Sequence, residues 1–404
     1  MERGDFDPRS AALATELTSG TLRYRLRLDY IIAKFIPRTL DSLDPEVRNV
    51  LRLGTYQIGF TRIPEYAACS SSVDLMKRIG LHRAAGFVNG VLRNIARGMD
   101  SVEYPDPDRD PVSWISVTES HPAWMVRWSM KRLGFEETLA WCRANNQRPE
   151  PTLRVNRLIA EPSDFDPGDF TPCRYAPDGL IYRGGGNPAD REEYRMGHYT
   201  IQSEASQLVT LAGGAEPGWK MMDGCAGRGG KATYLAELSG DRGEILAVDP
   251  YEDKLRALQA QCRRLGLRSI HTIVSDLQEL DAIPGSRDLV LLDVPCSGLG
   301  TIGREADARW HKTPEMLSEL PPLQGQLLDA GAQWVRSGGY LVYTTCSVAP
   351  EENERVVENF LSLSGEFAYA ETAPTLPGWS RGQMHLLPHV HGTDGAFAAV
   401  LRRR

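Results

Sequence analysis

Apolar residues in the first quarter of the chain recur at the spacing of amphipathic helices. The positions include Leu13, Leu17, Leu28, Ile31, Ile32, Phe35, Val47, Val50, Leu51, Val73, Met76, Ile79, Val88, Val91, Leu92 and Ile95. A period of three to four residues without strand alternation predicts helices that bury one face. We therefore predict an all-helical unit of five helices over residues 1–98, with breaks at Pro37, Asp44-Pro45, Pro64 and Gly80.

The pattern changes to alternating strands and helices from about residue 200. Probable strands are Lys220 to Asp223, Ile245 to Asp249, His271 to Asp276, Leu289 to Val294, Tyr340 to Thr345 and Phe397 to Leu401. Helical patterns lie at Thr233 to Leu238, Glu252 to Leu265, Pro314 to Val335 and Glu351 to Leu361. This alternation predicts an α/β fold whose mostly parallel sheet is covered on both faces.

The region between these two patterns is mixed. Asp100 to Pro111 is rich in Pro and Asp and lacks periodicity, which is typical of an exposed linker. Thr152 to Asn156 reads as a strand, and a helical pattern follows Pro122. We predict a linker over residues 99–118, a mixed α+β subdomain over 119–198 and the α/β domain over 199–404.

Charge and cysteine content narrow the class of protein. Net charge is −7 over 404 residues, but residues 1–100 carry +4 and residues 155–404 carry −10, so contact with a polyanion is favoured in the first quarter. No apolar run reaches membrane-spanning length, and the start MERGDFDPRS has no apolar signal region. The seven cysteines are scattered without a CxxC pair, so we expect no metal site and a cytoplasmic protein with reduced thiols.

A glycine-rich turn follows the first strand of the α/β pattern, in the segment Asp223 to Lys231, DGCAGRGGK. Its glycines allow a tight turn close to a nucleotide-like cofactor. The next strand ends in Asp249, 19 residues beyond the last glycine, where a carboxylate can bind ribose hydroxyls. Asp276 and Asp293 are expected at the next two strand ends. Three acids around a turn without a Walker lysine favour S-adenosylmethionine, which carries ribose and positive groups but no phosphate.

Two further strands each end near a cysteine, in DLVLLDVPCSGLG with Cys296 and in YLVYTTCS with Cys346. The 50 residues between the two cysteines leave room for one crossover helix, which allows their strands to be adjacent. A thiolate that adds to C6 of a pyrimidine makes C5 nucleophilic enough to accept a methyl group, and a second thiol could assist release. A structural pair or a redox disulfide is the alternative, and the two cysteines alone do not decide between these interpretations.

Together these motifs resemble those of the Nop2/Sun/RsmB family of RNA (cytosine-5)-methyltransferases. The matching segments are DGCAGRGGK, AVDP, SD, DVPCSG and TTCSVAPEEN, with QSEASQLV at residues 202–209, Pro388 and DGAF at residues 394–397. Paired Pro-Cys and Thr-Cys sites are specific to this family. Residues 9–98 resemble the NusB-like domain of its bacterial Sun/RsmB branch, so the resemblance covers nearly the whole chain.

The resemblance implies a fold, a reaction and a partner. The fold is a Rossmann-like methyltransferase core with a mostly parallel seven-stranded sheet, a NusB-like helical domain and a small mixed α+β RNA-binding subdomain. The reaction is S-adenosylmethionine-dependent methylation of a cytosine in 16S ribosomal RNA by a protein expected to be monomeric. Alternatives are the same chemistry on transfer RNA or another ribosomal cytosine, or a non-catalytic RNA-binding or assembly factor.

The resemblance also assigns roles to residues. Cys346 is the nucleophile, Cys296 aids product release, Asp293 lies near the target base and the cofactor's amino group, and Lys231 orients the reacting groups. The cofactor-binding residues are Cys225, Ala226, Gly227, Arg228, Gly229, Gly230 and Lys231, with Asp249 on the ribose, Asp276 near the adenine, and Asp293. Departures from the family pattern are Arg228 for a frequent Pro, Ser203 for a frequent Asp and Ala396 for a frequent Phe. The chain also begins where the first NusB-like helix would have ended, so either that helix is absent or the start is trimmed, and the RNA-binding role of the NusB-like domain is left open.

Overall fold

A computed structural model describes residues 7–370 and 375–404. The described residues form two compact units, one of residues 1–147 with 305–311 and one of residues 148–304 with 312–404. The predicted subdomain over 119–198 is therefore shared between the two units. In the part of the chain that the structure describes, no helix is long and apolar enough to cross a membrane.

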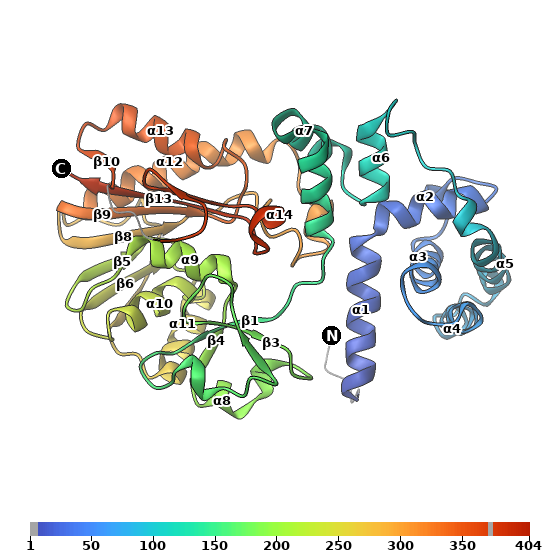
Figure 1. Ribbon diagram of the computed structural model, residues 1–404, viewed down its shortest axis with the longest axis horizontal. Coiled ribbons are helices and arrows are strands. Elements are labelled where there is room, and N and C mark those ends of the chain that lie inside the picture. Colours follow the sequence, from blue (N-terminus) through green and yellow to red (C-terminus); the bar gives the residue numbers. More distant parts are fainter. Residues whose placement is uncertain (1–6, 371–374) are drawn as a thin grey trace. The chain divides into compact units, whose positions relative to one another are not determined.

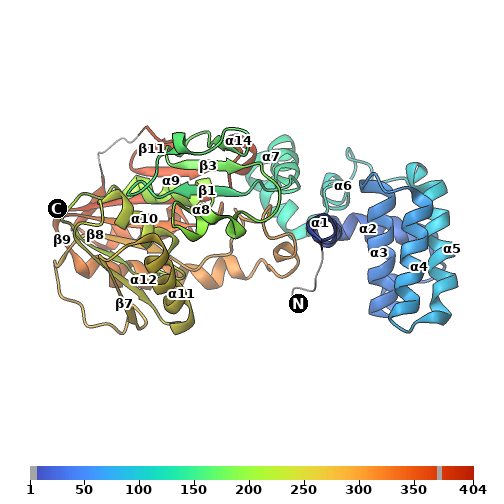
Figure 2. The ribbon, with the colours of Figure 1, turned by 90° about the horizontal axis from the view of Figure 1, so that it is seen from below.

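The first unit contains the predicted helices. Within residues 7–98 these are α1 (Pro8–Arg23), α2 (Arg25–Phe35), α3 (Pro45–Phe60), α4 (Glu65–Arg78) and α5 (His82–Gly98). The number of five helices and the breaks at Pro37, Asp44-Pro45, Pro64 and Gly80 are confirmed, but the break at Tyr24 between α1 and α2 was not predicted. A short 3-10 helix, Leu40–Ser42, precedes α3, and another, Met99–Ser101, follows α5. Helices α3, α4 and α5 run side by side (Figure 2) around a core that includes Ile32, Leu51 and Val88.

Two later helices and one distant segment complete this unit. Helix α6 (Pro111–Thr118) lies in the stretch predicted as a linker and was not expected, and α7 (Ala123–Asn145) follows. The segment 305–311 contains the 3-10 helix Ala308–Trp310. The buried guanidinium of Arg309 donates to the carbonyls of Ser120 at 3.2 Å and Asn145 at 3.0 Å and to Asn146 Oδ1 at 2.9 Å. Burial lowers the pKa of Arg309 to about 9, because a charged guanidinium is less favourable away from water.

The second unit begins with a small antiparallel sheet. Its strands are β1 (Thr152–Val155), β2 (Phe170–Pro172), β3 (Gly179–Tyr182) and β4 (Tyr199–Ile201), in the order β2-β3-β1-β4. The connections contain the 3-10 helices Pro162–Asp164 and Pro188–Asp190 and the short helix α8 (Glu192–Arg195). The strand predicted at Thr152 to Asn156 is confirmed as β1, and its apolar side chains Leu153 and Val155 are fully buried.

The large sheet holds the remaining strands. They are β5 (Lys220–Asp223), β6 (Glu244–Asp249), β7 (Ile270–Val274), β8 (Arg287–Asp293), β9 (Val335–Thr345), β10 (Phe367–Tyr369), β11 (Trp379–Ser380), β12 (Gln383–Leu386) and β13 (Ala396–Arg403). The order is β11-β12-β13-β9-β8-β5-β6-β7, and β10 also pairs with β13. Over the described residues this sheet has nine strands rather than the expected seven, since the three-residue β10 and the two-residue β11 add to its edge region. Its five strands from β7 to β9 are parallel.

Helices cover both faces of this sheet (Figure 1), as the apolar strands predicted. Helices α9 (Glu204–Gly213), α10 (Gly230–Leu238) and α11 (Glu252–Leu265) pack on one face, and α12 (Met316–Trp334) and α13 (Glu354–Leu363) pack on the other. Neighbouring residues of a strand point to opposite faces of the sheet. Met221 therefore packs in the core under α9, α10 and α11, and Met222 packs in the core under α12 and α13. The short α14 (Pro388–His391) precedes β13. The predicted α/β fold with a mostly parallel sheet covered on both faces and a helical N-terminal region is confirmed.

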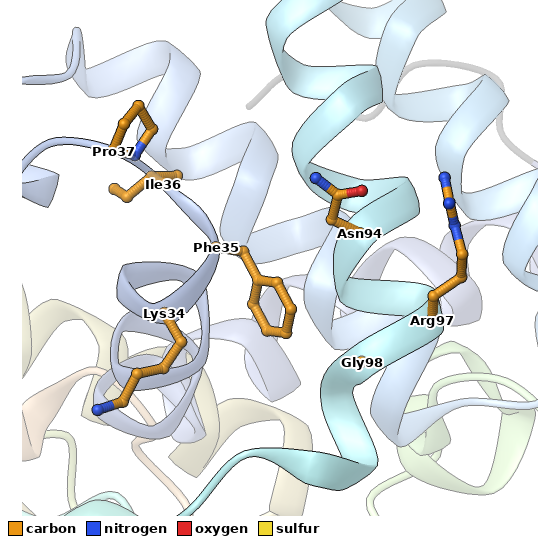
Figure 3. A pocket seen from close by; sticks show the side chains of 7 residues that line it. All are labelled: Lys34, Phe35, Ile36, Pro37, Asn94, Arg97 and Gly98. Carbon is orange, nitrogen blue, oxygen red and sulfur yellow. The ribbon is translucent and has the colours of Figure 1, made fainter.

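The helical unit carries an open surface hollow that is separate from the residues predicted to do chemistry. It is lined by Lys34, Phe35, Ile36, Pro37, Asn94, Arg97 and Gly98, at the ends of α2 and α5 (Figure 3). Phe35 points toward α5, and a Cβ at position 98 would lie 2.9 Å from its ring, so the ring packs closely against the backbone at Gly98. Apart from Lys34, Asn94 and Arg97 the lining has no polar side chain, and it contains no acid, thiol or histidine.

Candidate active site

The parallel strands of the large sheet deliver acids and thiols to one edge. Strands β5, β6 and β8 end at Asp223, Asp249 and Asp293, and β8 pairs in parallel with β9, which ends just before Cys346. The predicted adjacency of the two cysteine-bearing strands is confirmed. Because carboxyl ends of parallel strands meet at the same edge, these side chains converge there. Asp276 is the exception, because β7 ends two residues earlier, at Val274, and the prediction that Asp276 ends a strand is wrong.

The glycine-rich turn between β5 and α10 is held in shape by Asp249. One oxygen of Asp249 accepts a hydrogen bond from the Gly227 amide at 2.9 Å, and the other accepts from the Tyr251 amide at 2.9 Å. Gly227 and Gly229 have φ of +54° and +83°, and a Cβ at Gly229 would lie 2.0 Å from Leu258. Glycine is therefore required for both the backbone conformation and the close packing of α11.

The other residues predicted for this turn differ in what their side chains can reach. Ala226 is buried, and its amide donates to Val248 at 2.9 Å, while Arg228 is exposed. The Cys225 thiol packs against the apolar core, and burial together with the charge of Asp223 raises its pKa well above the usual value. The Gly230 carbonyl accepts from Arg154 at 2.7 Å. This turn therefore presents backbone groups rather than reactive side chains.

Asp276 lies in the turn after β7. One of its oxygens accepts from the backbone amide of Gln278 at 3.0 Å and from the Gln278 side chain at 3.3 Å. Its charge helps to raise the pKa of Cys225. It therefore lies beside the glycine-rich turn, although it does not share a hydrogen bond with the thiols among the described residues.

The two predicted catalytic thiols face one another. Cys296 Sγ and Cys346 Sγ are 3.2 Å apart, and both cysteines are free. Their mutual hydrogen bond, followed by burial, raises the pKa of Cys296 well above its usual value. The same bond lowers the pKa of Cys346, with help from Lys231 and Lys312 and against burial and the charge of Asp293. The two pKa shifts have opposite directions, so Cys346 is the sulfur that loses its proton more readily and Cys296 the one that keeps it.

Lys231 and Asp293 form an ion pair beside the thiols. Lys231 Nζ lies 2.6 Å from Asp293 Oδ2, with 12% and 37% of the two side chains exposed. Asp293 Oδ1 also accepts from Thr344 Oγ1 at 3.0 Å. Burial opposes the charge of Lys231, but Asp293 and Asp223 outweigh it and raise the pKa of Lys231. The pair keeps an ammonium group next to the Cys346 sulfur.

Three residues of the site were not predicted from the sequence. Asp223 is buried at the end of β5, and burial together with the charge of Asp293 raises its pKa to about 7. Lys312 donates through Nζ to the carbonyl of Ser297 and lies close enough to lower the pKa of Cys346. Glu352 is fully buried next to both thiol loops. Asp223 and Glu352 stand inside DGCAGRGGK and TTCSVAPEEN, which could have signalled them, whereas no motif marks Lys312.

The arrangement constrains the chemistry. Among the described residues there is no group of three or more His, Cys, Asp or Glu that could hold a metal ion. A thiolate paired with a thiol, beside an ammonium and two carboxylates, can add to an electron-poor carbon and move protons. The excess of acid at Asp223, Asp249 and Asp293 suits a ligand that brings positive charge.

Three protein-family models match successive parts of the chain. A model described as 16S rRNA methyltransferase RsmB/F matches residues 211–402, and a NusB family model matches residues 1–97. A model of a ferredoxin-like domain from RsmF/B-like methyltransferases matches residues 121–165. The three matches follow one another along nearly the whole chain.

Relatives and a solved structure match over the same length. Probable ribosomal RNA small subunit methyltransferase B of Synechocystis sp. is 34% identical over 418 residues, which cover 100% of this chain and 93% of that protein. The protein of the same description from Bacillus subtilis is 31% identical, with the same two coverages. The crystal structure of PH0851 has a TM-score of 0.83 and 27% identity, covering 99% of this chain and 91% of that one.

Proposed function

Since the chain belongs to the RsmB/F family of 16S rRNA methyltransferases, we propose that it methylates C5 of a cytosine in 16S ribosomal RNA through a covalent bond from Cys346 to C6. The observation that supports this mechanism is the facing pair of thiols, 3.2 Å apart and polarised in opposite directions. A structural pair would have no need of a lowered pKa at one sulfur.

S-adenosylmethionine is the cofactor in this proposal, and it supplies the methyl group when bound. The residues at the edge of the sheet fit it. Gly227 and Gly229 both have positive φ, and no atom lies within 4 Å of where a Cβ at Gly227 would stand, so a ligand would have room to approach the backbone there. Asp249 would hold the ribose, and Asp223 and Asp293 would face the positive groups of the cofactor, because Asp223 has no hydrogen-bonded cation among the described residues and Asp293 remains partly exposed beside Lys231.

Cys346 begins the reaction. Its thiolate adds to C6 of the cytosine, and the electron pair of the C5–C6 bond makes C5 the nucleophile that accepts the methyl group. Lys231 and Lys312 favour the thiolate because each places positive charge beside its sulfur. Asp293 is placed by Thr344 and Lys231 to accept hydrogen bonds from the base.

Cys296 acts after methyl transfer. A base takes the C5 proton, the electrons of the C5–H bond re-form the C5–C6 double bond, and the C6–sulfur bond breaks with its electrons returning to Cys346 as a thiolate. The protonated Cys296 thiol, whose pKa is raised, donates a hydrogen bond to that sulfur and so stabilises it as a leaving group. Cys296 thus assists release rather than attack.

Substitution of each thiol separates these roles. We expect Cys346→Ala to abolish methyl transfer from labelled cofactor to 16S RNA, because no other group replaces the nucleophile. Cys296→Ala should instead accumulate a covalent RNA adduct, seen as a shifted band on a denaturing gel. Cys262→Ala, at a free cysteine on α11, is the matched control and should keep full activity.

Either of two results would sink the mechanism. One is full turnover by Cys346→Ala, and the other is an adduct that forms in Cys346→Ala but not in Cys296→Ala. Mapping the methylated nucleotide by bisulfite sequencing tests the substrate separately, since the same chemistry on transfer RNA would modify a different molecule.

A further inference from the structure

A buried carboxylate links the two loops that carry the thiols. Glu352 lies between β9 and α13 and is fully buried. Its Oε1 accepts from the Ser297 amide at 2.7 Å and from Gln324 Nε2 at 3.2 Å. Its Oε2 accepts from Ser297 Oγ and from Ser347 Oγ, each at 2.5 Å. Within residues 7–370 and 375–404 it forms no ion pair, so neutral donors alone hold the charge.

The donors are the residues that follow the thiols. Ser297 comes directly after Cys296, and Ser347 directly after Cys346. Their hydroxyl oxygens are themselves 3.2 Å apart. One carboxylate therefore fixes both loops at the point where each thiol leaves its strand, and removing it would leave buried donors without an acceptor.

Among the described residues, other hydrogen bonds also hold the two thiol loops, but none of them links the residues that directly follow both thiols through one side chain. Asn353 accepts from Thr345 Oγ1 at 2.6 Å and donates to the Ser347 carbonyl at 3.0 Å, which fixes only the Cys346 loop. Lys312 reaches only the Cys296 loop, at the Ser297 carbonyl. A backbone bond from Gly300 to the Cys346 carbonyl, at 2.9 Å, joins the loops farther from the thiols.

We propose that Glu352 is a positioning residue that holds Cys296 and Cys346 face to face and keeps the proton on Cys296. The inference rests on the proposed function, in which Cys346 attacks as thiolate and Cys296 remains a thiol. A neutral residue of the same shape would hold the loops without supplying the charge, so the two contributions can be separated by experiment.

The charges around the pair are unevenly placed, which supports this assignment. The charge of Glu352 acts on Cys296, where it adds to the effects of Cys346 and of burial in raising the pKa. Lys231 and Lys312 act on Cys346 in the opposite direction, against Asp293. Tyr343, whose hydroxyl donates to the Glu352 carbonyl at 2.5 Å, also lies close to Cys296, and burial raises its own pKa so that it stays neutral.

The first experiment measures Cys296 without RNA. In a Cys346→Ala background the rate of Cys296 alkylation by iodoacetamide is followed against pH, with and without Glu352→Gln. We expect the Glu352→Gln change to lower the apparent pKa of Cys296 by about one unit, which is about 1.4 kcal/mol of lost repulsion. Glu358→Gln, at an exposed acid on α13, removes the same charge without touching the loops and should leave the profile unchanged.

The second experiment measures positioning in the full reaction. In Glu352→Ala, adduct formation should slow by roughly a hundredfold, about 2.7 kcal/mol, while cofactor affinity stays within about twofold. Glu352→Gln should restore at least about tenfold of that loss. Because Glu352→Ala leaves buried donors unpaired and can fail to fold, Ser347→Ala and Ser297→Ala form a second pair, expected to slow adduct formation and adduct release respectively.

Each result counts for or against the proposal. An unchanged alkylation profile in Glu352→Gln, or equal slowing of both steps by the two serine variants, would overturn it. Failure of the proposed function gives a different pattern, because Cys346→Ala would then remain active whatever the alkylation profile showed.

Discussion

Two ion pairs of the second unit differ in how far they are buried and in how completely they are paired. Arg154 and Glu237 are 0% and 1% exposed, and the guanidinium also bonds to Gln202, the Gly230 carbonyl and Thr233. Lys231 and Asp293 are 12% and 37% exposed, and the ammonium has donors left for another partner. The first pair is closed and joins β1 to the glycine-rich turn, whereas the second is open toward the thiols. Incomplete pairing therefore marks the reactive site more clearly than burial does.

Breaking the closed pair should have the largest effect. Arg154→Ala leaves Glu237 buried with no cation, although burial already raises the pKa of that acid. We expect a loss of about 3–5 kcal/mol in the free energy of unfolding, measured by urea denaturation. Arg256→Ala, whose ion pair with Glu252 on α11 is exposed, is the control and should change stability by less than about 1 kcal/mol. Equal losses in both variants would show that the closed pair has no special role.

Breaking the open pair should affect activity instead of stability. Lys231→Met removes positive charge beside Cys346, so adduct formation should slow by roughly a hundredfold, or about 2.7 kcal/mol. Asp293 is partly exposed and can be solvated, so stability should change by less than about 1 kcal/mol. A quenched single-turnover assay beside a urea curve measures both effects. A large loss of stability with unchanged chemistry would reverse the contrast between the two pairs.

The smallest expected effect concerns Asp223, which has no hydrogen-bonded cation in the described structure. Its folded-state pKa of about 7 lies above the usual 3.8, so its contribution to stability is fully present below pH 3.8 and is lost as pH rises through 7. Asp223→Asn avoids this loss and should raise Tm relative to the wild type by roughly 2–4 °C at pH 8, with a smaller gain at pH 5. Calorimetry at the two pH values measures the difference, and a gain that is larger at pH 5 would contradict the sign.

The sequence predicted the strands and the thiol pair because their signals are local. Buried parallel strands are nearly continuous apolar runs, so β5, β6 and β8 were found within a residue or two. Their acidic ends followed from the pattern, and the proximity of Cys296 to Cys346 followed from the expected crossover. The error at Asp276 arose because Ser275 and Asp276 directly follow the apolar run and were counted with it, whereas pairing ends at Val274.

Other features depend on contacts that local patterns do not encode. Glu352 follows another acid in a turn, a setting that usually indicates an exposed side chain, and only the folded loops bury it. Helix α6 was missed because the linker composition before it extends to Pro111, which is its first residue. The buried Arg309 lies in a segment without apolar periodicity, and its acceptors come from residues more than 160 positions earlier.

The segment 305–311 also bears on how the chain reaches its fold during synthesis. Residues 1–147 emerge first, but Arg309, whose guanidinium engages the carbonyls of Ser120 and Asn145, is added roughly 160 residues after Gln147. At usual translation rates that interval is on the order of ten seconds. The hydrogen bonds from Arg309 can therefore form only after most of the second unit has been made. A nascent chain stalled before residue 305 should show faster amide hydrogen exchange around Ser120 than the released protein.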